Sequence, residues 1–135
     1  MLVAYFTSDE VNEDTAVQLA ADCGAMLCTE PFRGQFPDGE FDAVVYDWDY
    51  LPACYQQAAM SFLLAKPPYY PVAVHGYHLT DDEAWALREN GVQVHRHLEP
   101  ALFVGLLLSH TLAGAGVKNG WAQAHAGERD SNRRR

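Results

Sequence analysis

The amino-acid sequence predicts a single α/β domain, in which helices cover both faces of a parallel β-sheet. Short apolar runs typical of buried strands alternate with longer segments whose apolar residues recur at helical spacing. Glycines and prolines stand where those helices should end and begin. The chain has 135 residues, 49% of them hydrophobic, which is enough for one domain with a substantial core.

The chain opens with an expected strand, "LVAYFTS" (2–8). The next segment, 11–24, has apolar residues at helical spacing and stops at Gly24, a residue type common just after a helix. "AMLCT" (25–29) is a second short apolar run. This order predicts a strand–helix–strand unit.

The segment 30–41 should be a loop, because it contains two prolines and two glycines. It also carries three phenylalanines, Phe32, Phe36 and Phe41. We expect these rings to fill the core beside the loop, and a binding loop is the second interpretation.

The middle of the chain repeats the alternation. "DAVVYD" (42–47) is a third strand, and 52–66 is a helix with Pro52 in its first turn. "PVAVH" (71–75) is a fourth strand.

The clearest helix is 80–91. Thr80 and Glu83 match a capping box, acidic residues fill the first turn, and Gly91 follows the end.

The last elements are a strand and an apolar helix. "VQVHRHL" (92–98) alternates strictly, and 99–114 is a helix with Pro100 near its start. We expect a domain over 1–112 and a flexible tail over 113–135, because the tail residues are small and polar.

Charge is unevenly distributed along the chain. The net charge is −9, but residues 1–112 hold 4 Lys and Arg against 16 Asp and Glu, whereas residues 113–135 hold 5 against 2. An acidic body argues against nucleic acid as a partner. No segment resembles a signal peptide or a membrane span, so we expect a cytoplasmic protein whose three cysteines are reduced.

Polar residues gather where the strands should end. In open α/β sheets the ligand site lies outside the carboxyl ends of the strands. The segments expected there are "TSDE" (7–10), "DWDY" (47–50), "HGYH" (75–78) and "HLEP" (97–100).

Over residues 1–112 the sequence resembles a response-regulator receiver domain. The resemblance rests on the element order, on "FDAVVYD" with Asp47 ending the third strand, on the following "LP", on "PVAVH", on "AWALRENGVQV" and on the last helix starting at a proline. It implies a flavodoxin-like fold with strand order 2-1-3-4-5, about four helices, and a second helix reduced to a loop.

The resemblance also implies site positions, and this chain departs from most of them. Receivers accept a phosphoryl group on the aspartate matched by Asp47, using Mg²⁺ held by an acidic pair, a lysine, and a Thr or Ser. The remaining positions hold other residues here: Thr7 and Ser8 at the acidic pair, His75 or Gly76 at the Thr/Ser, and Glu99 at the lysine. The chain therefore resembles a degenerate receiver, a pseudo-receiver.

Three ligand hypotheses remain open at the strand ends. A set of carboxylates would attract Mg²⁺, with solvated acids as the alternative: Asp9, Glu10, Asp47 and Asp49. A set of imidazoles would hold zinc or respond to pH, with scattered surface histidines as the alternative: His75, His78 and His97. A flavin could lie between Tyr77 and Trp48, beside "TSDEVNEDT" (7–15). No cofactor is otherwise expected.

The last helix is apolar nearly all round, which predicts an interface. We expect a homodimer through the last strand–helix face, with these interface residues: Leu102, Phe103, Leu106 and Leu107. The alternative is that the tail covers the helix with Trp121.

The sequence thus predicts a stand-alone pseudo-receiver that acts as a phosphorylation-independent interaction module in signal transduction, with a signalling protein as partner. It is not expected to be an enzyme, because neither G-x-S-x-G nor a P-loop is present. The alternatives are a weakly phosphorylatable receiver using Asp47, and a metal- or flavin-binding protein using the same strand ends.

Overall fold

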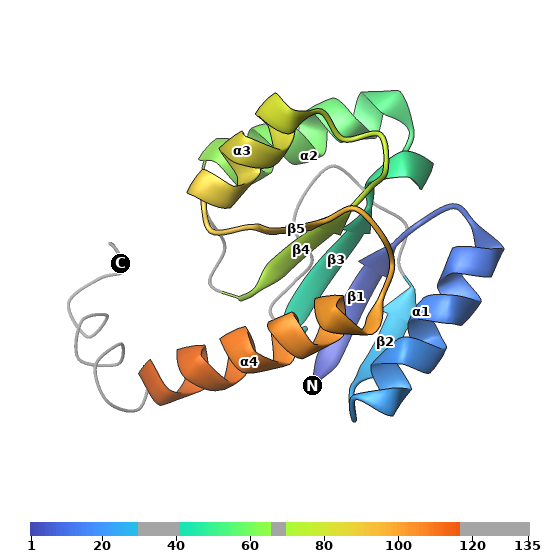
Figure 1. The fold of residues 1–135 in the computed structure, drawn as a ribbon, viewed down its shortest axis with the longest axis vertical. Coiled ribbons are helices and arrows are strands. Elements are labelled where there is room, and N and C mark those ends of the chain that lie inside the picture. The colour runs from blue at the N-terminus through green and yellow to red at the C-terminus, as the bar shows by residue number, and fades with distance from the viewer. Residues whose placement is uncertain (30–40, 66–69, 117–135) are drawn as a thin grey trace.

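The computed structural model describes residues 1–29, 41–65 and 70–116, which form a five-stranded parallel sheet with helices on both faces (Figure 1). The strand order is β2-β1-β3-β4-β5, as the sequence predicts. The strands are β1 (Leu2–Phe6), β2 (Met26–Thr29), β3 (Ala43–Asp47), β4 (Val72–His75) and β5 (Gln93–His95).

The described residues also form four α-helices and a short 3₁₀ helix, and the last helix, α4, follows the final strand. Figure 1 shows α2 and α3 on one face of the sheet and α1 and α4 on the other. The helices are α1 (Glu10–Asp22), η1 (Trp48–Tyr50), α2 (Ala53–Ala65), α3 (Asp81–Glu89) and α4 (Pro100–Gly116).

The alternation of side chains along each strand builds two separate cores. Ala4, Val44 and Val74 face α2 and α3, where they meet buried residues such as Leu63 and Leu87. Val3, Val45 and Ala73 face α1 and α4, and they pack against a different buried set. That set includes Ala16, Ala20, Leu102, Phe103 and Leu106.

The structure confirms the predicted capping residues at the ends of the helices. The capping box at Thr80 is complete, since Thr80 Oγ1 accepts from the Glu83 amide and the Glu83 carboxylate accepts from the Thr80 amide. Gly24 and Gly91 have φ angles of 80° and 81°, which a residue with a Cβ adopts only with strain.

Two boundaries differ from the expectation. β5 ends at His95 rather than at 98, and the next side chain, Arg96, turns back to bind the Leu79 carbonyl and the Asp81 carboxylate. α4 continues to Gly116, so the helix extends past the expected domain end at 112. Apart from Phe41, the expected loop 30–41 and the tail beyond Gly116 lie outside the described residues.

In the part of the chain that the structure describes, no helix has the length and apolar character needed to cross a membrane.

Candidate functional site at the strand ends

Asp47, the last residue of β3, is the centre of the site. Its side chain is only 1% exposed. Its Oδ2 atom accepts hydrogen bonds from Thr7 Oγ1 at 2.7 Å and from Asn12 Nδ2 at 2.9 Å, and the Tyr5 hydroxyl lies 3.5 Å away. Each of these groups is uncharged, so the carboxylate is satisfied by dipoles rather than by a cation.

The backbone explains why these donors converge. Tyr5 and Thr7 are two residues apart, so both point to the α1 and α4 face that also holds Asp47. Thr7 Oγ1 accepts from the Asp9 amide at 3.0 Å, and the Asp9 carboxylate caps α1 by accepting from the Asn12 amide at 3.0 Å. The start of α1 thus fixes the position of Asn12.

His75, at the end of β4, lies beside Asp47 in the sheet register. Its Nε2 is 2.8 Å from the Tyr5 hydroxyl, and the two rings stack with centroids 5.7 Å apart. Its Nδ1 is 3.8 Å from Asp47 Oδ1. Burial lowers the pKa of His75 below its ordinary value, although the negative charges of Asp47 and Asp49 oppose that shift. Burial also raises the pKa of Tyr5, and the Asp47 charge adds to this effect.

Asp49 connects η1 to the loop between β4 and α3. Its carboxylate accepts from the Tyr77 amide at 2.7 Å and from the His78 amide at 3.0 Å. A Cβ at Gly76 would lie 2.8 Å from the Cβ of Trp48, so the close approach of the two segments requires glycine there. Asp49 therefore holds the loop between β4 and α3 in place through two hydrogen bonds.

The predicted magnesium set is not assembled. Asp9 caps α1, Glu10 is exposed at the start of that helix, and Asp49 binds loop amides. Within the described residues, no group of three or more His, Cys, Asp or Glu is placed to hold a metal ion. The reason is that Asp9 and Glu10 follow β1 too late to point at Asp47, whereas Thr7 does reach it.

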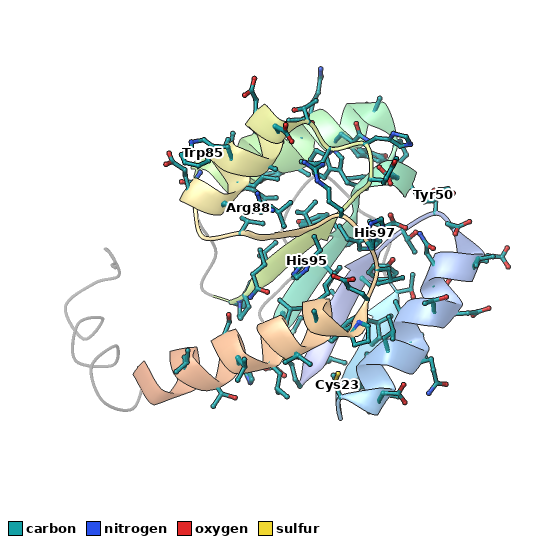
Figure 2. The ribbon with its side chains drawn as sticks, viewed as in Figure 1. Cys23, Tyr50, Trp85, Arg88, His95 and His97 are labelled. Atoms are coloured by element: carbon teal, nitrogen blue, oxygen red, sulfur yellow. The ribbon has the colours of Figure 1, made fainter. Side chains whose placement is uncertain are left out.

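Among the described residues, the predicted histidine set is not gathered at one point either. His75 is buried against Tyr5, whereas His78 and His97 are exposed and their rings lie near the ring of the loop residue Tyr77. The Tyr77 ring lies 5.4 Å from His78 and 6.0 Å from His97, between centroids. Figure 2 shows His95 and His97 in succession where β5 leads into the loop to α4.

The flavin hypothesis fails on Trp48. The indole is buried in the core on the α2 and α3 face, so it is not available to stack on a ligand beside the exposed Tyr77.

Glu99, at the position where the resemblance implies a lysine, is exposed just before α4. Its charge raises the pKa of His95, which burial lowers to a greater extent, so the net shift is downward. His95 in turn lies beside His75 in the sheet register. Position 99 therefore carries a negative charge where the resemblance implies a positive one, so it supplies no cation to Asp47.

The interface prediction names the wrong side of α4 for three of its four residues. Leu102, Phe103 and Leu106 are completely buried against the sheet of the same chain. Leu107 is partly exposed, on the outward side of the helix. The exposed apolar residues there form one stripe, here called the outer α4 stripe: Val104, Leu107, Leu108 and Leu112.

Two contributors to the site, Tyr5 and Asn12, are absent from the residues selected on sequence. Tyr5 reads as an ordinary core residue of an apolar strand, and Asn12 as an ordinary polar residue of a helix start. Their positions in the sequence could have indicated them. Tyr5 lies near the carboxyl end of β1 and Asn12 in the first turn of α1, and in this kind of sheet both places lie beside the end of β3.

No protein-family model and no curated protein sequence matches the chain. Solved structures do match. A proposed pilus assembly protein (cpaE) from Burkholderia thailandensis has a TM-score of 0.61 and 16% identity, over 83% of this chain and 98% of the other. The non-phosphorylated HemR receiver domain from Leptospira biflexa has a TM-score of 0.60 and 15% identity, over 81% and 92%.

The beryllofluoride-activated NtrC4 receiver domain dimer is also similar, with a TM-score of 0.54 and 16% identity, over 83% of this chain and 94% of the other. Together with the strand order β2-β1-β3-β4-β5, these similarities show that the chain has the receiver fold.

Proposed function

We propose that the chain is a pseudo-receiver, a regulatory module that works through protein–protein contacts and whose state does not depend on phosphorylation of Asp47. One observation carries the proposal: the Asp47 carboxylate is buried and is already bound by the neutral donors Thr7 and Asn12.

Phosphoryl transfer to this carboxylate would need three things for which the described residues give no support. The carboxylate oxygen must be reachable, and a metal ion and a cationic side chain must neutralise the charge of the transferring group. Asp47 is buried, no described group of acids is placed to hold a metal with it, and Glu99 adds negative charge instead. Burying a phosphoryl group here without compensating charge would be strongly unfavourable.

The direct test uses Trp48 as a reporter, because it is the neighbour of Asp47 in the chain. Replacing Trp85 and Trp121 by Phe leaves Trp48 as the single indole. We expect no saturable fluorescence change on titration with Mg²⁺ and then beryllofluoride, a phosphoryl mimic. A saturable change that disappears in the Asp47→Asn variant would show that Asp47 works as a weak phosphoacceptor and would refute the proposal.

The outer α4 stripe supports the interaction half of the proposal. Val104, Leu108 and Leu112 recur every fourth residue, so they lie in one row on the helix, and Leu107 adjoins them. A continuous exposed apolar row of this kind is typical of an interface. We propose a second copy of the chain as the occupant, and the similar NtrC4 receiver domain is itself a dimer.

A matched pair of variants tests this surface. Val104 on α4 and Val17 on α1 are 45% and 46% exposed, and both lie well inside their helices. Light scattering after size exclusion should give twice the 15.0 kDa chain mass for the wild type and for Val17→Asp, but the single mass for Val104→Asp. A wild-type monomer, or a Val104→Asp dimer, would refute the homodimer.

A further inference from the structure

The contacts of His75 suggest what regulates the site if a phosphoryl group does not. We propose that the strand-end site is a proton-linked switch, in which protonation of His75 draws its ring toward Asp47 and reverses the hydrogen bond of Tyr5. This regulation rests on the function proposed above, since it requires Asp47 to remain an unmodified carboxylate.

When His75 is uncharged, Tyr5, His75 and Asp47 are joined by one short polar contact and two long ones. The Tyr5 hydroxyl lies 2.8 Å from His75 Nε2, a normal hydrogen bond in which the hydroxyl donates to the unprotonated nitrogen. That tautomer leaves the proton on Nδ1, facing Asp47 Oδ1 at 3.8 Å. Tyr5 is also 3.5 Å from Asp47 Oδ2. Both contacts to the carboxylate are too long to be good hydrogen bonds.

Adding one proton from solvent to His75 changes each contact. Nε2 now carries a hydrogen, so it must donate to the Tyr5 oxygen, which becomes the acceptor. The Tyr5 hydrogen then turns to its other neighbour, Asp47 Oδ2. The imidazolium Nδ1–H faces a carboxylate of opposite charge, so both long contacts should shorten to the roughly 2.7–2.9 Å of a charge-assisted hydrogen bond.

The groups around His75 set the pH at which this happens. Tyr5 faces it from β1, Asp47 from β3, Asp49 from η1 and His95 from β5. The two carboxylates favour the imidazolium, whereas burial and the second imidazole oppose it, and burial is the largest effect. Burial therefore holds the pKa of His75 below its ordinary value of 6.5, so the imidazole is uncharged near pH 7 and takes up a proton in acid.

More distant charges act through these neighbours. The Asp9 charge raises the pKa of Tyr5, which keeps the hydroxyl proton in place. At His95, Glu99 favours the charged imidazole and Arg88 opposes it. On the α1 side, the neighbour of the carboxylate is the neutral amide of Asn12.

A shift of His75 would be transmitted to the loop that follows β4. The next residue, Gly76, donates its amide to the His95 carbonyl at 3.0 Å and lies against Trp48. Tyr77 and His78 are held by Asp49. Because Trp48 contacts this loop at Gly76, its fluorescence should report a movement of His75.

The experiment is a pH titration without Mg²⁺ or beryllofluoride. Histidine Cε1–Hε1 signals of the whole chain are followed by NMR, and fluorescence is followed in the protein with Trp85→Phe and Trp121→Phe. We expect His75 to titrate below pH 6.5 and Trp48 fluorescence to change with the same midpoint. His75→Gln should abolish the fluorescence change, whereas His95→Gln, its neighbour on β5, should retain it.

Asp47→Asn supplies a second readout, because removal of the facing charge should lower the midpoint of His75 further. The inference is overturned if His75 does not titrate before the protein unfolds in acid, if Trp48 responds equally in His75→Gln, or if Asp47→Asn leaves the midpoint unchanged. The wild-type NMR titration decides the matter even if His75→Gln does not fold. Any of these failures leaves the phosphorylation-independent function untouched, since only a beryllofluoride response contradicts that.

Discussion

In the part of the chain that the structure describes, the buried Asp47 carboxylate is stabilised by hydrogen bonds from uncharged groups. A buried charge is costly unless its oxygens accept hydrogen bonds, and a bond to a charged group contributes more than a neutral one. Thr7 and Asn12 supply these bonds to a single oxygen. The hydroxyl at position 7 is therefore a structural requirement of this site.

Thr7→Val tests that requirement, because it removes the hydroxyl and keeps the shape of the side chain. We expect urea unfolding at pH 7 to show a loss of about 1.5–3 kcal/mol, the range for a hydrogen bond to a charged acceptor. Thr15→Val is the matched control, since the Thr15 hydroxyl binds only the Val11 carbonyl of its own helix, on the surface. Equal unfolding midpoints for the two variants would contradict this account of Asp47.

At the scale of elements, the connection between η1 and the β4–α3 loop is the most specific feature. Two successive loop amides donate to one carboxylate, Asp49, and Gly76 allows the backbone to approach Trp48. The loop conformation is thus set by a side chain outside the loop.

Asp49→Ala should release this loop. We expect hydrogen exchange of the Tyr77 and His78 amides to accelerate by at least about tenfold, because each loses a hydrogen bond to a charged acceptor. Asp82→Ala removes a similar charge from an exposed site at the start of α3 and should leave these amides unchanged. Unchanged exchange in Asp49→Ala would show that Asp49 does not hold the loop.

Elements were more predictable from sequence than contacts. Alternation and caps locate the strands and α3, because those signals are local. The buried side of α4 could not be located in this way, since a helix that is apolar nearly all round has no distinct apolar face. The position of Asp47 at a strand end was predictable from its place after "AVVY", but its partners Tyr5 and Asn12 depend on how β1, β3 and α1 are placed against one another.

For the whole molecule, the buried titratable groups limit stability at both ends of the pH scale. His75 and His95 have lowered pKa values, so the unfolded chain binds more protons than the folded one, and stability falls as pH drops below 6.5. Tyr5 and Tyr46 have raised pKa values, and burial raises the pKa of Tyr70 to about 12. Their contribution is complete below pH 10 and is lost as pH rises above it.

The free energy of unfolding measured against pH should therefore be greatest on a plateau between about pH 6.5 and 10, the ordinary values of the two residue types. Tyrosinate absorbance should rise together with unfolding on the alkaline side. Tyr46→Phe should reduce the slope there, whereas Tyr77→Phe, an exposed residue, should not. If the free energy of unfolding of Tyr46→Phe falls with alkaline pH as steeply as that of the wild type, Tyr46 does not contribute to the alkaline loss of stability.

The neutral surroundings of Asp47 also constrain how this sequence can evolve. A single Thr7→Asp change would place a second carboxylate where a hydroxyl now donates at 2.7 Å, and among the described residues no third ligand is placed to hold a metal ion that would offset the repulsion. Each isolated step toward a metal site should therefore cost stability, and energetic coupling between neighbours makes the steps interdependent. Among homologues we therefore expect positions 7, 12 and 75 to change together or not at all.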